Sequence, residues 1–279
     1  MSNSYSLATR FGRNQTFVRS SSPLSNDEIM RVAPSIFAED KHTSRSERYT
    51  YIPTITVLEG LRKEGFSPFM VCQTRTRDDD KRSHAKHMIR MRHASQIDAN
   101  EANEVVLLNS HDGTSSYQML AGVYRFVCSN GMVCGDTHND IRVRHTGDIV
   151  DNVIDGAFKV LDGFELVDGQ RDGMKSLTLN PGEQSAFARA ALALRYDTET
   201  APAPITEDQL LRAQRRADTA PDLWTTFNRV QENMLRGGLR GRTATGKVMR
   251  TREVQGIDQN IKLNRVLWVL AEEMRRIKG

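Results

Sequence analysis

The stretch from residue 236 to residue 252, RGGLRGRTATGKVMRTR, contains no acidic side chain. Its basic residues are Arg236, Arg240, Arg242, Lys247, Arg250 and Arg252. Arginine contacts phosphates and stacks on bases, and the interspersed glycines let the backbone follow an irregular path. Basic stretches are often polyanion sites, so we expect a nucleic-acid contact here, and a solvated flexible linker is the alternative.

Positive charge is concentrated toward the end of the chain. Residues 236–279 hold eleven Lys and Arg against four Asp and Glu, a local net charge of +7 that leaves −3 for the rest. The net charge of the whole chain is only +4, so the argument for a polyanion partner depends on this location.

Within the same stretch, Gly241–Lys247 spells G-x-x-x-x-G-K, the start of a phosphate-binding loop. Residue 248 is Val where that motif needs Ser or Thr to hold magnesium, and no apolar strand precedes it. We therefore reject ATP hydrolysis at this position and expect no cofactor.

A second basic group belongs to the middle of the chain. In His84–His93 (HAKHMIRMRH) the even positions are mostly basic, whereas Ile89 and Met91 lie on the other side of an extended strand. We expect a basic sheet face or groove for single-stranded nucleic acid, and an ordinary solvated face is the alternative. Its candidate contacts are Arg75, Arg77, Lys86, Arg90, Arg92, Arg142 and Arg144.

Residues that could support metal binding or catalysis do not form a convincing set. Cys128, Cys134 and His138 are spaced too widely for a structural zinc site. Ser110, His111, Asp112 and Ser115 contain triad residue types within one turn, where turn chemistry is the simpler explanation. We expect no metal and no catalytic residues.

Asp136, His138 and Asp140 would share one side of an extended segment and could bind a divalent metal. A metal-dependent nuclease therefore stays as a minor alternative, although a polar turn explains these residues more simply.

The pattern of apolar residues predicts an α+β fold, in which an antiparallel sheet meander is packed by helices and followed by a helical C-terminal extension. Helices are expected from Ser25 and over Pro53–Lys63, ending at Gly65. Period-two segments between Phe66 and about His145 indicate four to six strands. The later helices are expected at 148–161, 181–194, 207–217, 223–235 and 258–277.

This pattern divides the chain into three parts. Residues 1–24 are rich in Ser, Asn and Arg without periodicity and are expected to form a flexible arm. Residues 25–196 are expected to form the α+β core, and residues 197–279 a helical region that begins with the linker 198–204 (TETAPAP).

The sequence shows no secretory h-region and no apolar run approaching the roughly 18 residues of a membrane span. The three cysteines, Cys72, Cys128 and Cys134, are too few for a disulfide framework. We expect a protein of the reducing cytoplasm with no membrane partner.

Two segments resemble a known family. Leu107–Val133 (LLNSHDGTSSYQMLAGVYRFVCSNGMV) and Thr251–Met274 (TREVQGIDQNIKLNRVLWVLAEEM) resemble the phage- and plasmid-borne family known as domain of unknown function 932. The likeness covers most of the chain and implies a mobile genetic element, without an activity to carry over.

A second resemblance is to single-strand-annealing proteins of the RecT and Erf kind. Tyr49–Arg77 looks like the entry to their sheet, with a helix, the Gly65-Phe66 pair and then strands. The likeness is one of topology. It implies a homo-oligomer, a ring or filament, that holds single-stranded DNA in a basic groove without a nucleotide cofactor.

We therefore expect a protein that binds and anneals single-stranded DNA, or RNA, in mobile-element recombination or replication, and not an enzyme. The alternative is an anti-defence or regulatory protein that acts by protein–protein interaction, with the basic stretch on an acidic partner surface.

Overall fold

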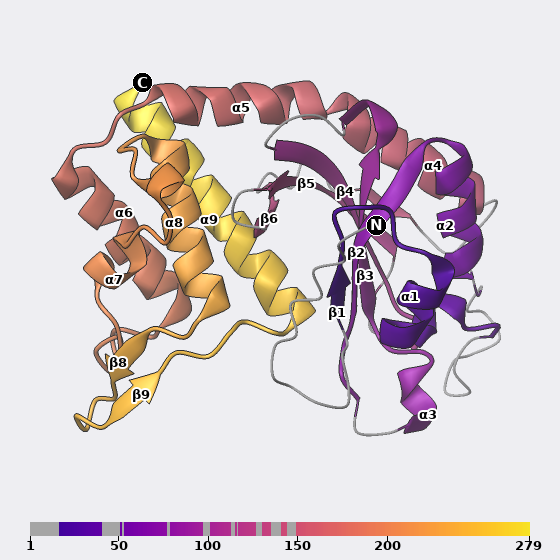
Figure 1. Cartoon of the computed structure of the whole chain (residues 1–279), viewed down its shortest axis with the longest axis horizontal. Coiled ribbons are helices and arrows are strands. Elements are labelled where there is room, and N and C mark those ends of the chain that lie inside the picture. Colours follow the sequence, from indigo (N-terminus) through magenta and orange to yellow (C-terminus); the bar gives the residue numbers. More distant parts are fainter. Residues whose placement is uncertain are drawn as a thin grey trace. The chain divides into compact units, whose positions relative to one another are not determined.

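The computed structural model describes residues 17–40, 51, 53–76, 79–96, 101–112, 115, 117–126, 130–134, 141–143 and 149–279. The chain forms two compact units (Figure 1). The first contains Met1–Val123 and His138–Phe164, and the second contains Tyr124–Thr137 and Glu165–Gly279.

The first unit is built on an antiparallel sheet in the order β1-β2-β3-β4-β5, with β7 paired to β5. Its strands are β1 (Phe17–Arg19), β2 (Phe66–Gln73), β3 (His87–His93), β4 (Glu101–Asn109), β5 (Tyr117–Arg125, apart from its last two residues) and β7 (Ile141–Val143). Strand β3 lies between β2 and β4, with Arg90 opposite Met70 on one side and Val106 on the other. The register shifts between Pro68 and Met70 on β2, where proline supplies no ladder N–H.

Helices α2 and α4 pack against one face of this sheet (Figure 1). Gly60 on α2 lets Ile154 of α4 approach closely, and a Cβ at Gly156 of α4 would lie 2.1 Å from the Met119 side chain. The helices of this unit are α1 (Asn26–Val32), the 3-10 turn Pro34–Phe37, α2 (Thr54–Lys63), α3 (Asp79–Arg82), the 3-10 turn Ala94–Gln96 and α4 (Ile149–Asp162).

The second unit is mainly helical. Its elements are β6 (Asn130–Val133), α5 (Phe164–Ser176, apart from its first residue), α6 (Pro181–Arg195), α7 (Glu207–Leu211), the 3-10 turn Arg216–Asp218, α8 (Leu223–Arg236), β8 (Arg240–Arg242), β9 (Val248–Arg250) and α9 (Ile257–Lys278). Helix α6 packs against α7, α8 and α9. Trp224 and Phe227 of α8 form an aromatic cluster with Trp268 of α9, with ring centroids 6.1 and 6.0 Å away.

The predicted α+β class, with a sheet meander and a helical C-terminal extension, is confirmed. The predicted helix start at Ser25 is also confirmed, because Ser25 and Glu28 form a reciprocal capping box. Between β2 and β3 the chain also forms the short helix α3, and helix α5 was not predicted.

Two predicted boundaries differ from the structure. Phe17–Arg19, which the prediction placed in the N-terminal arm, forms edge strand β1 and pairs with Met70–Cys72, while residues 1–16 lie outside the described part. The predicted boundary at 196/197 falls inside the second unit, because α6 packs against the helices that follow it.

Candidate nucleic-acid interface

The predicted irregular stretch is an ordered β-hairpin. Strands β8 and β9 pair antiparallel, with Arg240 opposite Arg250, Gly241 opposite Met249 and Arg242 opposite Val248. The connecting turn closes through a hydrogen bond from the N–H of Gly246 to the carbonyl of Thr243, 2.8 Å long. Gly246 has φ +82°, a conformation that favours glycine. The stretch is therefore not an irregular linker.

Glycines fix the base of the hairpin against its neighbours. Gly237 has φ +68°, and a Cβ there would lie 2.5 Å from the backbone of Arg252. A Cβ at Gly241 would lie 2.1 Å from the carbonyl oxygen of Pro204, which accepts a 2.9 Å hydrogen bond from the N–H of Arg242. Gly241 is thus a packing residue in a strand with no helix after it, which confirms that Gly241–Lys247 is not a phosphate-binding loop.

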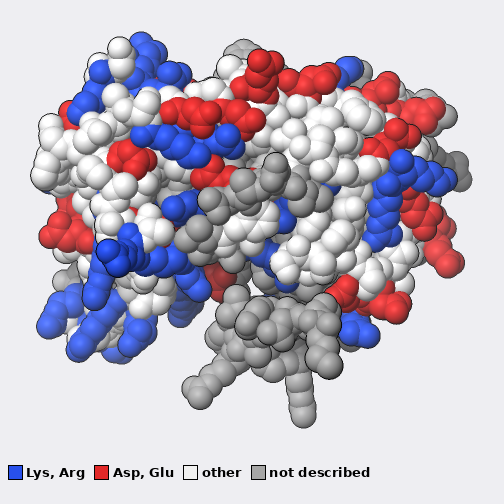
Figure 2. All heavy atoms as spheres, turned by 45° about the horizontal axis from the view of Figure 1, so that its top comes forward, with Lys and Arg blue, Asp and Glu red and all other residues white. Residues whose placement is uncertain are grey.

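The outward face of the hairpin is cationic. Residues 240, 242, 248 and 250 share this face by register, whereas Gly241, on the other face, is buried. Figure 2 shows Lys and Arg side chains gathering at this end of the second unit. Like charges directly opposite on paired strands are destabilising, so the Arg240–Arg250 pair costs stability without a bound anion.

All six predicted basic residues of the stretch are exposed. Within the described ranges, no carboxylate lies within ion-pair distance of Arg240, Arg242, Lys247, Arg250 or Arg252. The guanidinium groups donate instead to backbone carbonyls, Arg242 to Gly246 at 3.1 Å and Arg250 to Gly238 at 3.2 Å. Five cations are therefore available to an anionic partner.

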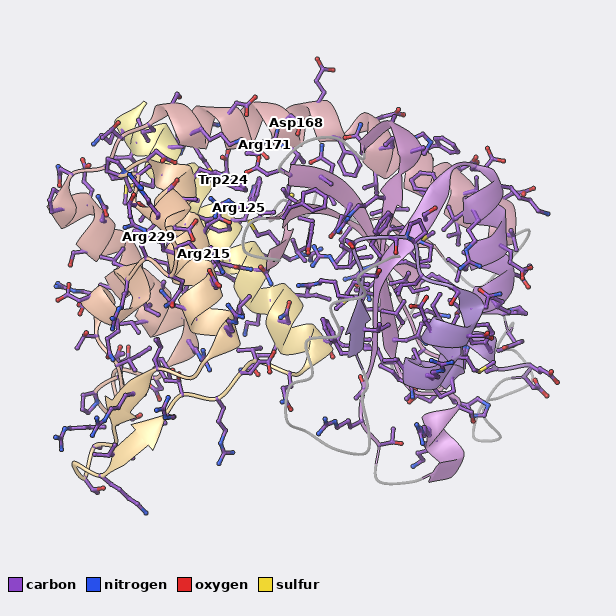
Figure 3. All side chains as sticks on the ribbon, in the orientation of Figure 1. Arg125, Asp168, Arg171, Arg215, Trp224 and Arg229 are labelled. Carbon is purple, nitrogen blue, oxygen red and sulfur yellow. The ribbon has the colours of Figure 1, made fainter. Side chains whose placement is uncertain are left out.

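The sixth residue, Arg236, ends a chain of ion pairs that begins inside the second unit. Arg125 contacts Asp218 at 2.6 Å, and Asp218 contacts Arg215 at 2.8 Å. Arg215 then pairs with Glu232, which also accepts a 2.7 Å hydrogen bond from Arg236. Figure 3 labels Arg125 and Arg215 among the helices of this unit. The chain ties the root of the hairpin to the interior.

Asp218 stays ionised in this chain although it is buried. Burial favours its neutral form, but hydrogen bonds from Arg125 and Arg215 outweigh that effect and hold the pKa of Asp218 below its ordinary value. The carboxylate thus remains a fixed anion between the two arginines.

Strand β3 presents neither the predicted basic face for nucleic acid nor the alternative, a solvated basic face. Arg90 and Arg92 are 2% and 1% exposed, and their Nε atoms lie 2.6 and 2.9 Å from the two carboxylate oxygens of Glu104 on β4. The guanidinium of Arg92 also lies 4.2 Å from the ring centroid of Phe69. Strand β3 is buried on both faces, so these arginines are structural in this conformation.

The remaining predicted sheet residues are not brought into one group by the strand order. Arg75 is exposed just after β2, and Lys86 is half-buried just before β3, at the same end of the sheet. Arg142 is exposed on β7, opposite Gln118 of β5, and strands β4 and β5 separate β7 from β3. Arg77 and Arg144 lie outside the described residues.

A buried polar cluster in the first unit was not predicted. The Thr54 hydroxyl, at the start of α2, lies 3.0 Å from His87 Nε2, 3.2 Å from His111 Nε2 and 3.1 Å from the Tyr117 hydroxyl. It also accepts a 3.0 Å hydrogen bond from the side-chain amide of Asn109. All five side chains are fully buried. The cluster joins α2 to strands β3, β4 and β5 and to His111, two residues after the end of β4, and no solvent reaches it in this conformation.

Burial, reinforced by the neighbouring His111, lowers the pKa of His87 to about 3, so the imidazole is neutral at pH 7.

The residues around His111 confirm the turn chemistry expected for Ser110–Ser115. The Ser110 hydroxyl donates to the Ser115 carbonyl at 3.2 Å and accepts from the Ser115 N–H at 2.8 Å. A triad is not formed, because His111 points into the cluster.

Among the described side chains, no three His, Cys, Asp or Glu residues come together as a set of metal ligands. Cys128, Asp136, His138 and Asp140 lie outside the described ranges. Burial raises the pKa of the Cys72 thiol to about 12, so this thiol is protonated at pH 7. In the part of the chain that the structure describes, no helix has both the length and the apolar character that crossing a bilayer requires.

Fold and site together define an α+β protein with a buried, paired sheet and an exposed basic hairpin on its helical unit. The chain belongs to the family described as "Domain of unknown function (DUF932)", whose model matches residues 41–268. This confirms the resemblance seen in the sequence.

Two curated proteins of Escherichia coli (strain K12), UPF0380 protein YfjQ and UPF0380 protein YafZ, are similar to it along nearly their whole length. Each is 53% identical over 268 residues, which is 96% of this chain and 97% of the relative. No solved structure matches the chain.

Proposed function

We propose that this protein binds and anneals single-stranded DNA in the cytoplasm, as a homo-oligomer that serves recombination or replication of a mobile genetic element. The observation that carries the proposal is the exposed, directly opposed Arg240–Arg250 pair on an ordered hairpin. A pair that destabilises the free protein is explained if a bound phosphate backbone neutralises it.

The composition of the hairpin fits a contact with the phosphate backbone of a nucleic acid. Its five available cations are Arg240, Arg242, Lys247, Arg250 and Arg252. A contact made through phosphates is independent of sequence and weakens steeply with salt, by about 0.7 in log K per log unit of salt for each phosphate neutralised on a single strand. Five contacts therefore predict a slope of about −3.5.

The annealing part of the proposal draws on the likeness in topology to single-strand-annealing proteins and on the α+β sheet. The buried Arg90 and Arg92 take no part in it, which moves the proposed contact from the sheet to the hairpin. No nucleotide is needed, because pairing of complementary strands is itself favourable.

The test is fluorescence anisotropy with labelled single-stranded DNA and a matched duplex, at several salt concentrations, with magnesium present and product gels run alongside. Wild-type protein should prefer the single strand, and the double variant Arg240→Ala/Arg250→Ala should bind more weakly with a flatter salt dependence. Arg31→Ala, which removes an exposed arginine on α1, is the matched control and should bind like wild type.

Other outcomes separate the alternatives. No binding at low salt would overturn the proposal and favour an acidic protein surface as the partner of the hairpin. Cleaved DNA in the product gels would instead indicate a metal-dependent nuclease.

A further inference from the structure

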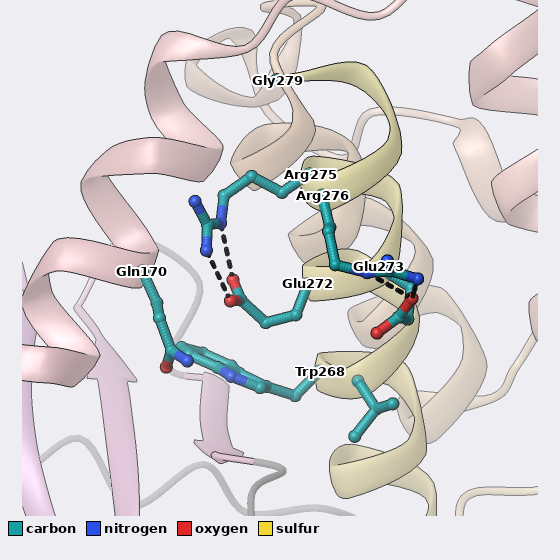
Figure 4. Close-up of a pocket in the computed structure, with 8 residues that line it drawn as sticks. Gln170, Trp268, Glu272, Glu273, Arg275, Arg276 and Gly279 are labelled. Atoms are coloured by element: carbon teal, nitrogen blue, oxygen red, sulfur yellow. Dashed lines mark hydrogen bonds and ion pairs between the residues drawn. The ribbon is translucent and has the colours of Figure 1, made fainter.

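The second unit contains a cavity of about 440 Å³ between α5 and the last turns of α9 (Figure 4). Gln170 of α5 lies on one side, and Trp268, Glu272 and Arg275 of α9 lie on the other. Pockets of about 300–1,000 Å³ with apolar walls and a few polar groups are typical of small-ligand sites. The size of this cavity therefore suits a group such as a base with its sugar.

The charges around the cavity are already paired. Arg275 donates to both carboxylate oxygens of Glu272, at 3.2 and 3.0 Å, and Arg276 donates twice to Glu273. Two cations and two anions leave no net charge from these pairs. The cavity is thus suited to a neutral, polar group and not to a phosphate.

Two polar groups at the cavity make no hydrogen bond within the described residues. Trp268 is 1% exposed, and its indole N–H has no hydrogen-bond partner within the described residues. A buried donor of this kind costs free energy unless a partner is supplied. The Gln170 amide at the same cavity likewise makes no hydrogen bond to a described residue (Figure 4).

We propose that this cavity takes one unstacked nucleobase of the bound single strand. This inference rests on the proposed function, and it supplies what the hairpin lacks. Residues 236–252 contain no aromatic side chain, although proteins that hold single strands combine phosphate contacts with aromatic contacts to bases.

The groups match the edges of a base. The indole N–H of Trp268 donates to a ring nitrogen or carbonyl oxygen, and the Gln170 amide offers one donor group and one acceptor to the same edge. Because the indole is buried in the free protein, the side chains that cover it must move aside for the base to reach it. The base then occupies the space between α5 and α9.

The experiment is an NMR titration of the full-length protein with neutral nucleosides, with ¹⁵N label in the two tryptophans. Trp224→Phe assigns the two indole signals. Addition of millimolar nucleoside should shift the Trp268 signal and leave the Trp224 signal in place, and Gln170→Leu should weaken that response several-fold. Gln170 is only half-buried, so its replacement leaves the fold intact.

Nucleosides carry no phosphate, so the result is independent of the hairpin. The Arg240→Ala/Arg250→Ala variant should lose affinity for single-stranded DNA and keep the nucleoside response. No shift of Trp268 with any nucleoside, or equal shifts of both indole signals, would overturn the base site even if the protein binds single-stranded DNA. A Trp268 shift in a protein that does not bind DNA would leave the cavity as a nucleoside site and refute the proposed function alone.

Discussion

Replacing Arg250 by Glu should stabilise the protein and weaken its binding to nucleic acid. The change converts the directly opposed Arg240–Arg250 pair into one of opposite charge. Cross-strand charge pairs are worth roughly 0.2–1 kcal/mol, so removing the repulsion and adding an attraction should raise the free energy of unfolding by up to about 1 kcal/mol. The lost hydrogen bond from Arg250 to the Gly238 carbonyl, 3.2 Å long and exposed, offsets only a small part of this gain.

The effect on binding has the opposite sign. The variant loses one phosphate contact and places a carboxylate beside the phosphate backbone of the bound strand. The slope of log K against log salt should therefore become shallower by at least about 0.7, from the wild-type value of about −3.5 to about −2.8. Thermal or urea unfolding gives the stability, and anisotropy at several salt concentrations gives the slope.

Arg250→Gln is the matched control, because it removes the charge without creating an ion pair. It should lie between wild type and Arg250→Glu in both measurements. The reasoning would be refuted if Arg250→Glu were less stable than wild type, or if it bound single-stranded DNA with an unchanged slope.

Three further predictions concern the fold. Glu104→Gln removes the carboxylate that pairs with both buried arginines, Arg90 and Arg92, and should cost about 3–5 kcal/mol in urea unfolding. Glu59→Gln, at an exposed position on α2, should cost almost nothing, and equal effects of the two changes would contradict the role of the ion pairs. His87 has a pKa near 3 in the folded protein and about 6.5 when unfolded, so the unfolded state binds more protons between these values. Stability should therefore fall as the pH is lowered from about 6.5 toward 3, with a smaller loss in His87→Asn, and equal pH profiles for the two proteins would count against the role of His87. Gly237→Ala places a Cβ on a residue with φ +68°, 2.5 Å from the backbone of Arg252. It should lower the free energy of unfolding by at least about 1–2 kcal/mol and weaken DNA binding. A fully stable variant would show that the hairpin root is less tightly packed.

Local patterns predicted much of the fold correctly. Ser25 and Glu28 mark a helix start because their capping hydrogen bonds are local, and the period-two segments mark strands because alternate residues face the core. Helix α5 was missed because Gly169 and Gly173 weaken its apparent propensity. In the structure, Gly173 instead makes room for the Arg275 side chain.

The site was less predictable, because burial depends on distant partners. The alternation in β3 placed Arg90 and Arg92 on one side correctly, but it could not show that both contact the carboxylate of Glu104 on β4. A lone acidic residue in the apolar strand EVVLLN was the available signal. The cluster at Thr54 joins residues 33 to 63 positions apart, and no local pattern reports such contacts.

The chain of ion pairs from Arg125 to Arg236 alternates three cations with two carboxylates, so it holds one more positive than negative charge. That surplus emerges at Arg236, the most exposed member at 62%. An anion that binds at the hairpin root competes with Glu232 for Arg236. Because Glu232 also pairs with Arg215, and Arg215 with Asp218, this competition changes the electrostatic environment of both residues. Binding of an anion at Arg236 and ionisation of the buried Asp218 are therefore linked. If one changes the free energy of the other, the reverse effect has the same size.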